Sequence, residues 1–209
     1  MNIFPQLTED QRDCLQEIAN VAMGQAGDVL ARLLGTFVTL SVPKIGILVP
    51  AEVRQFISAD SITVACQSFY NISGQYGLRG EALTVFDGGS FHGLAELLDY
   101  EQSVMTSSNE QELLLDIANV LNGACLTGIA DQLGEELFFG APSILKQNTQ
   151  NMQGTRLLQH EQLQWKAALS VEIDYRLEKH AFHCELLLLM PDSAIDWLIT
   201  RLTRFLEEM

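Results

Sequence analysis

A carboxylate and a carboxamide on one predicted helix are the residues of this chain best placed for chemistry. Residues 13–33 have the periodicity of an amphipathic helix, and Asp13, Glu17 and Asn20 occupy positions i, i+4 and i+7. At about 100° per residue, these side chains share one helix face. A carboxylate accepts hydrogen bonds from cationic side chains, whereas a carboxamide both donates and accepts. The face could bind a polar partner, although an acidic outer face is more commonly just solvated.

Small residues extend this face toward the end of the helix. Gly24 and Gly27 follow Asn20, so a partner could approach the backbone closely there. Glycine and asparagine disfavour helix and are poor choices for a merely solvated face. We name this surface the first ridge, and it consists of Asp13, Glu17, Asn20, Gly24 and Gly27. The opposite side is predicted to be a core stripe of Leu15, Ile18, Ala22, Ala26, Val29 and Leu33.

A second predicted helix, at residues 109–133, repeats the arrangement. Its outward positions at the same spacing form the second ridge, which consists of Glu112, Asp116, Asn119 and Gly123. Two helices with the same outward pattern in one short chain indicate an internal duplication. The predicted halves are residues 1–100 and 101–209, approximately, and together they form one domain.

A proline follows each ridge at the same distance. Pro43 lies 23 residues after Asn20, and Pro142 lies 23 residues after Asn119. The shared spacing extends the repeat well beyond the two helices, which strengthens the interpretation as a duplication.

The second ridge departs from the first at two positions. Asp116 stands where the first ridge has Glu17, and Leu126 stands where it has Gly27. Aspartate is shorter by one methylene, about 1.5 Å of reach. Leu126 is expected to add bulk to the outer surface. The sequence therefore predicts a first site that is more effective than the second.

The remaining segments predict an α+β fold. Residues 37–49 are β-rich, and Pro43 within them suggests an edge strand or a bulge. The other predicted strands are 61–70, 74–87, 136–145, 164–176 and 181–190. The other predicted helices are 90–99 and 193–206, and polar segments at 100–108 and 146–162 connect the elements. Each half reads helix–strand–strand–strand–helix. We expect a mainly antiparallel sheet with the two long helices side by side, related by a pseudo-twofold axis, and both ridges outward.

The composition excludes several classes of partner. The chain has 209 residues, enough for one well-buried domain. Its net charge of −15 argues against nucleic acid or an anionic membrane as partner. No apolar run approaches the roughly 18 residues of a membrane span. The N-terminus lacks the features of a signal peptide. The four cysteines are widely spaced, and we interpret them as reduced thiols in the core. Both features predict a cytoplasmic protein.

Other chemistry is not predicted. His180 and His183 flank the start of a strand, and neither forms a recognised metal-ligand spacing with a cysteine or carboxylate. The sequence contains no GxSxG, GxxxxGK[ST], GxGxxG or HExxH motif. We therefore expect no metal site, and the two ridges are the candidates for function.

The motif Asp13-x3-Glu17-x2-Asn20-x22-Pro43 resembles that of the CheC/CheX/FliY family of chemotaxis phosphatases. The second ridge, with Pro142, is an altered copy, and the length and duplication are most like CheC. The resemblance covers essentially the whole chain. It implies a hydrolase that removes the aspartyl phosphate from a CheY-type response-regulator receiver.

The resemblance also implies roles for the ridge residues. Glu17 would pair with a receiver lysine, and Asn20 would hold the attacking water in line. Asp116 and Asn119 would be the second catalytic pair. The implied partner-binding residues are Asp13, Gly24, Gly27, Glu112 and Gly123. The receiver would supply Mg²⁺, so the chain would need no cofactor of its own, and the receptor deamidase CheD is a second candidate partner.

An alternative class is a non-catalytic binding module in chemotaxis or the flagellar switch. The ridges would then be docking surfaces for a receiver or for CheD. A pure docking surface has no need of the pair Glu17 and Asn20, which favours the catalytic interpretation. A third hypothesis is that the protein is an unrelated acidic scaffold, and the repeated motif argues against it. The sequence leaves open which receiver is the substrate, whether the second site is active, and the oligomeric state.

Overall fold

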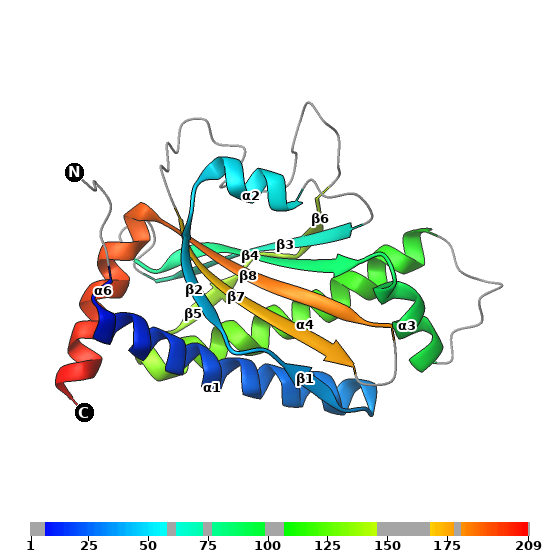
Figure 1. Ribbon diagram of the computed structural model, residues 1–209, viewed down its shortest axis with the longest axis horizontal. Helices are drawn as coiled ribbons and strands as arrows, with labels where there is room; N and C mark the ends of the chain where they lie inside the picture. The colour runs from blue at the N-terminus through cyan, green and yellow to red at the C-terminus, as the bar shows by residue number, and fades with distance from the viewer. Residues whose placement is uncertain are drawn as a thin grey trace.

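The computed structural model describes residues 7–57, 62–72, 77–98, 107–145, 168–177 and 181–208. They form the predicted α+β fold, with helices on both faces of a curled antiparallel sheet (Figure 1). The helices are α1 (Glu9–Leu34), α2 (Pro50–Ile57), α3 (Ser90–Leu97), α4 (Ser107–Leu133) and α6 (Asp192–Glu207). The strands are β1 (Val38–Leu40), β2 (Lys44–Leu48), β3 (Ile62–Asn71), β4 (Arg79–Asp87), β5 (Leu137–Phe139), β6 (Ser143–Ile144), β7 (Ala168–Leu177) and β8 (His183–Pro191).

Local signals set the ends of the two long helices. At the start of α1, the Thr8 hydroxyl accepts a hydrogen bond from the Gln11 backbone N–H at 3.2 Å. The Gln11 side-chain oxygen accepts one from the Thr8 N–H at 2.9 Å, which completes a capping box. Gly35 after α1 has φ 62° and Gly134 after α4 has φ 65°, a left-handed conformation that glycine adopts without strain. These two glycines are separated by 99 positions, the same separation as Asn20 and Asn119.

The sheet interleaves the two halves of the chain. Its order is β1-β7-β8-β4-β3-β5, with β2 also beside β7 and β6 also beside β3. The first two strands of each half thus pair with the third strand of the other half. Val38 faces Leu177 in register, and Leu137 faces Asn71. This exchange is what two intertwined copies of one unit would produce, and the duplication remains a prediction from the repeat.

The predicted strands at 37–49 and 136–145 are each broken in two. Residues 41–43 separate β1 from β2, and residues 140–142 separate β5 from β6. Proline lacks the N–H that a continuous ladder requires, and each break contains one. Each half therefore has four strands rather than three, and the first half also has α2. The predicted polar segment 146–162 lies outside the described residues, as does 100–108 up to residue 106, and α4 begins at Ser107.

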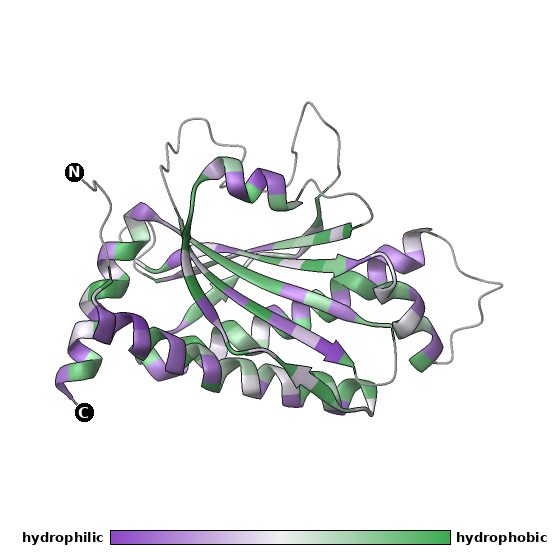
Figure 2. Cartoon of the chain, viewed as in Figure 1, coloured by the Kyte–Doolittle hydropathy of each residue, from purple (hydrophilic) through white to green (hydrophobic). Residues whose placement is uncertain are grey.

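The main core lies between the sheet and the pair α1 and α4, which run side by side beneath it (Figure 1). Along β7 the apolar residues of this core alternate with polar ones, as a two-sided strand requires. A smaller cluster on the other face packs beneath α2. Figure 2 shows this distribution, with hydrophobic residues over much of the central strands and hydrophilic ones along the start of α1. All four cysteines are free and buried, as predicted, and burial raises the pKa of Cys125 to about 12.

The α4 helix is long and apolar enough to cross a membrane by length and composition. No apolar run of this kind was expected from the sequence. Over half of its apolar window is buried against the rest of the protein, and its second ridge carries two exposed carboxylates, Glu112 and Asp116. Burial of this kind is typical of a core helix.

The core stripe of α1 was predicted correctly only in its first part. Leu15, Ile18, Ala22 and Ala26 are buried, but Val29 is 41% and Leu33 is 51% exposed. Leu30 and Leu34 are buried instead. The buried face turns along the helix because β1 packs against its C-terminal part, where Leu40 contacts Gly27. The position of β1, which follows α1 in the sequence, thus determines which residues at the end of α1 are buried.

The helices α1 and α4 come close together at Gly128. A Cβ atom on Gly128 would lie 2.9 Å from the Cα of Ala22 and 2.6 Å from the side-chain oxygen of Gln25. Both distances are shorter than van der Waals contact, so the absence of a side chain lets the two backbones come together. A Cβ atom on Gly123, on the same helix, would meet no other atom within 4 Å.

Gly128→Ala is expected to lower the free energy of unfolding by about 1–3 kcal/mol, because the added methyl forces the helices apart. The matched change Gly123→Ala is expected to raise it by about 0.5–1 kcal/mol through helix propensity alone. Urea unfolding followed by circular dichroism measures both. Equal effects at the two positions would contradict a close contact at Gly128.

Candidate functional site

The first ridge presents its polar side chains to solvent. Asp13, Glu17, Asn20 and Gly24 are all exposed on α1. Within the described part of the chain, no side chain forms a hydrogen bond or an ion pair with Asp13, Glu17 or Asn20. The space above Gly24 is open to 4 Å. Because the buried apolar residues of α1 face the sheet and α4, the opposite face is left available to a partner.

Gly27 does not belong to this open surface, contrary to prediction. It is buried, and Leu40 of β1 would lie 3.0 Å from a Cβ atom placed on it. Its lack of a side chain lets β1 pack against α1. The open part of the first ridge is therefore Asp13, Glu17, Asn20 and Gly24.

The second ridge has the same exposed carboxylates and carboxamide. Glu112, Asp116 and Asn119 are exposed on α4, and Gly123 is half-buried beneath open space. The predicted bulk of Leu126 on this surface is wrong, because Leu126 is 2% exposed and belongs to the main core. Gly27 and Leu126 occupy corresponding positions, and both are buried. The difference between them therefore affects core packing and not the exposed surface.

The two carboxamides differ in their hydrogen bonding. The side-chain amide of Gln67, on β3, donates to the Asn119 side-chain oxygen at 3.0 Å and to the Gly140 backbone oxygen at 2.9 Å. Gln67 is 3% exposed. Its position, four residues before Asn71, corresponds to Ile173, four residues before Leu177 in β7. An isoleucine cannot donate a hydrogen bond, so the Asn20 carboxamide has no such support.

Gln67 is part of a polar group inside the core. The Thr84 hydroxyl donates to the side-chain oxygen of Asn122 at 2.7 Å, and Asn122 is fully buried on the inner side of α4. The Gln67 side-chain oxygen and the Asn122 side-chain nitrogen are buried without a hydrogen-bond partner among the described residues. Sequence analysis missed Gln67, although a glutamine inside the apolar run of 61–70 was a usable signal.

The arrangement of each ridge can bind a polar partner and orient a bound molecule. Each ridge offers carboxylates to a cation and a carboxamide that can hold a water molecule or a phosphoryl oxygen. In the described part of the chain, one cluster has ligand atoms close enough for a metal ion, and it lies on the opposite face of the sheet. Neither ridge contributes to it.

Comparison with known proteins gives related sequences and folds. No family model matches the chain. CheY-P phosphatase CheC of Bacillus subtilis is 28% identical over 155 residues, which cover 69% of this chain and 70% of that protein.

Solved structures of other proteins share the fold. FliY of Thermotoga maritima superimposes with a TM-score of 0.70 at 18% identity, covering 98% of this chain and 99% of that chain. The FliM middle domain of H. pylori gives a TM-score of 0.61 at 12% identity, covering 93% and 99%.

These structural likenesses concern the fold, whereas the match to CheC concerns the sequence. Together they confirm the resemblance that the ridge motif predicted. The chain is therefore similar to CheC in sequence and to FliY and the FliM middle domain in fold.

Proposed function

We propose that this protein is a cytoplasmic chemotaxis phosphatase that hydrolyses the aspartyl phosphate of a CheY-type receiver. The observation that carries the proposal is the pair Glu17 and Asn20, exposed one turn apart on a rigid helix with no partner among the described residues. The sequence match to a protein named as a CheY-P phosphatase supports the same reaction.

In the proposed reaction, the first ridge positions the attacking water and the phosphoryl group. A water oxygen attacks phosphorus in line, the bond from phosphorus to the aspartyl oxygen breaks, and inorganic phosphate and the aspartate carboxylate are released. The side-chain oxygen of Asn20 would accept a hydrogen bond from that water, and its side-chain NH₂ would donate one to a phosphoryl oxygen. The Mg²⁺ that offsets phosphoryl charge would belong to the receiver.

The other residues of the first ridge would dock the receiver. Glu17, one turn before Asn20, would pair with a receiver lysine and set the depth of insertion. Gly24, one turn after Asn20, has open space above it, which would let the receiver backbone approach α1. Asp13 lies a full turn further out and would make a peripheral contact.

Asn20→Ala is expected to lower the rate at the first site by on the order of a hundredfold, because a loosely held water is misplaced. The measurement is phosphate release from a CheY-type receiver phosphorylated with acetyl phosphate. Arg32→Ala, on the exposed side of the same helix but off the ridge, is the control and should keep the wild-type rate. Full activity in Asn20→Ala together with loss in Asn119→Ala would show that the first ridge is the wrong site.

The second site is expected to be the weaker one. Asp116 is shorter than Glu17, and the Asn119 side-chain oxygen that would accept a hydrogen bond from the water already accepts one from Gln67. The double variant Glu17→Ala/Asn20→Ala should therefore lose most of the total rate. Asp116→Ala/Asn119→Ala should lose little, with the same receiver in both assays. Equal losses would mean that the receiver adjusts to the shorter side chain and that the two sites are equivalent.

Gln67→Leu tests why the second site is weak. In the background of Glu17→Ala/Asn20→Ala, it frees the Asn119 oxygen and makes this position resemble Ile173, so the residual rate should rise several-fold. Adding Asp116→Glu should raise it further. A fall in rate with unchanged circular dichroism would show instead that Gln67 holds Asn119 in its productive orientation.

A second candidate function is a non-catalytic docking module, which the structural likeness to the FliM middle domain favours. The ridges would then bind a receiver or CheD without turnover. Phosphate release separates the two functions. If the chain binds phosphorylated receivers of its host without shortening their lifetime, the docking function replaces the phosphatase.

A further inference from the structure

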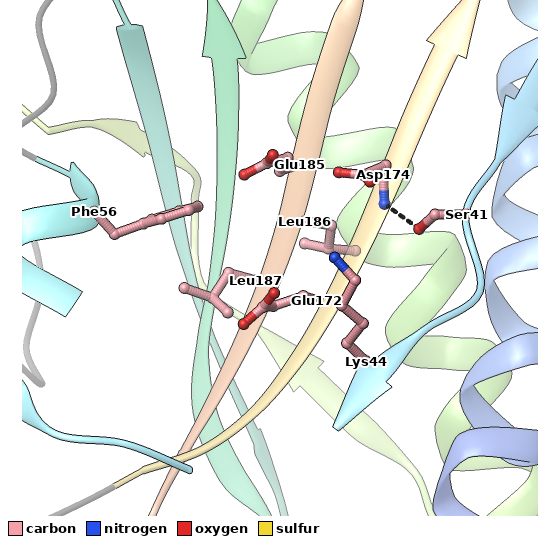
Figure 3. Close-up of a pocket in the computed structure, with 8 residues that line it drawn as sticks. All are labelled: Ser41, Lys44, Phe56, Glu172, Asp174, Glu185, Leu186 and Leu187. Atoms are coloured by element: carbon pink, nitrogen blue, oxygen red, sulfur yellow. Dashed lines mark hydrogen bonds between the residues drawn. The ribbon is translucent and has the colours of Figure 1, made fainter. Parts of the chain in front are cut away.

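A cluster of ionisable side chains lies on the sheet face opposite the main core. Asp174 on β7 and Glu185 on β8 are directly opposite each other in register, and His183 lies two residues before Glu185. The nearest ligand atoms of these three residues all lie within 4.8 Å of one another. Figure 3 shows Asp174 and Glu185 on adjacent strands at the edge of a small pocket. All three are half-buried.

The imidazole of His183 is also oriented by a third carboxylate, that of Asp87. Its Nδ1 lies 3.6 Å from Oδ2 of Asp87 at the end of β4. The other oxygen of Asp87 accepts hydrogen bonds from the Ser90 hydroxyl at 2.7 Å and from the Gly89 N–H at 3.2 Å, which fixes the carboxylate. A carboxylate that faces one ring nitrogen holds the proton on that side and leaves the other nitrogen free to bind a metal ion.

The free nitrogen of His183 faces the cluster. Its Nε2 is buried without a hydrogen-bond partner among the described residues, and it lies 3.5 Å from Oδ1 of Asp174. That distance is too long for a good hydrogen bond. A buried nitrogen aimed at a carboxylate, with nothing bonded between them, is the arrangement that a shared cation would satisfy.

The local charge is also unbalanced. Asp174 and Glu185 form a like-charge pair across the strands, an arrangement that is destabilising by itself. Glu172 lines the same pocket, and Lys44 is the one cationic side chain that does so among the described residues. A divalent cation between the strands would offset this negative charge.

We propose that Asp174, His183 and Glu185 bind one divalent transition-metal ion, with Asp87 as the residue that orients the histidine. One imidazole nitrogen and two carboxylate oxygens are ligands that Zn²⁺ accepts, and Zn²⁺ binds such sets more tightly than Mn²⁺. The adjoining cavity of about 60 Å³ leaves room for a water molecule as the fourth ligand. The ion would join β7 to β8, and its binding does not depend on the phosphatase proposal.

The test is direct titration of the full, chelator-treated chain with zinc chloride, followed by calorimetry. We expect one ion per chain, weaker binding of Mn²⁺ and the weakest of Mg²⁺, and a melting temperature that rises with Zn²⁺. Asp174→Asn and His183→Gln should each weaken Zn²⁺ binding by at least about tenfold, and Asp87→Asn by a similar factor. Glu172→Gln is the matched control from the same pocket and should change the affinity by less than about threefold.

Two further measurements keep the proposal falsifiable. Asp174→Asn relieves the like-charge pair, so it should preserve or raise the melting temperature without metal while abolishing the rise with Zn²⁺. Co²⁺ in place of Zn²⁺ should give a spectrum without thiolate charge-transfer bands, because the four cysteines are not ligands. No saturable Zn²⁺ binding, binding unchanged in Asp174→Asn and His183→Gln, or a thiolate spectrum would each overturn the proposal.

Discussion

The contact between α1 and α4 at Ala22 and Gly128 is the constraint on which both ridges depend. Two long helices that meet over a missing side chain can lie close enough to share one core above the sheet. Once the apolar sides of both helices face each other and the sheet, the polar sides can only face outward. The exposure of Glu17 and Asn20 is therefore a consequence of how the inner faces pack.

The sequence predicted the parts of this arrangement that are local to a helix. The spacing of Leu15 and Ile18 identified the inner face of α1, and the spacing of Glu17 and Asn20 identified the outer one. It did not predict the exposure of Val29 or the burial of Gly27. Both result from β1, which packs against the end of α1 because its own hydrogen-bond partner is β7, far along the chain. Periodicity within one helix carries no information about that strand.

The two carboxamides illustrate the same division. Asn20 and Asn119 are equivalent in spacing, and the sequence treats them as equivalent apart from the neighbouring carboxylate. Gln67 of β3 donates a hydrogen bond to Asn119, whereas the position of β7 that corresponds to Gln67 is an isoleucine, Ile173. Gln67 and Asn119 are 52 positions apart, so their hydrogen bond depends on the pairing of β3 with its neighbours. A repeated motif thus predicts where a site is, whereas strand pairing decides how each copy is supported.

Strand β7 connects the ridge face of the protein with the ionic cluster on the other side. Ile173 points into the main core and Asp174, the next residue, points to the opposite face, because side chains alternate along a strand. A slip of one residue would bury Asp174 and expose Ile173, with a cost on both faces. The register is fixed by three neighbours, β1, β2 and β8, two of which come from the first half of the chain. The pairing of β7 with strands of the first half therefore fixes both faces of β7. It places Ile173 in the core beside α1 and α4, and it places Asp174 beside His183.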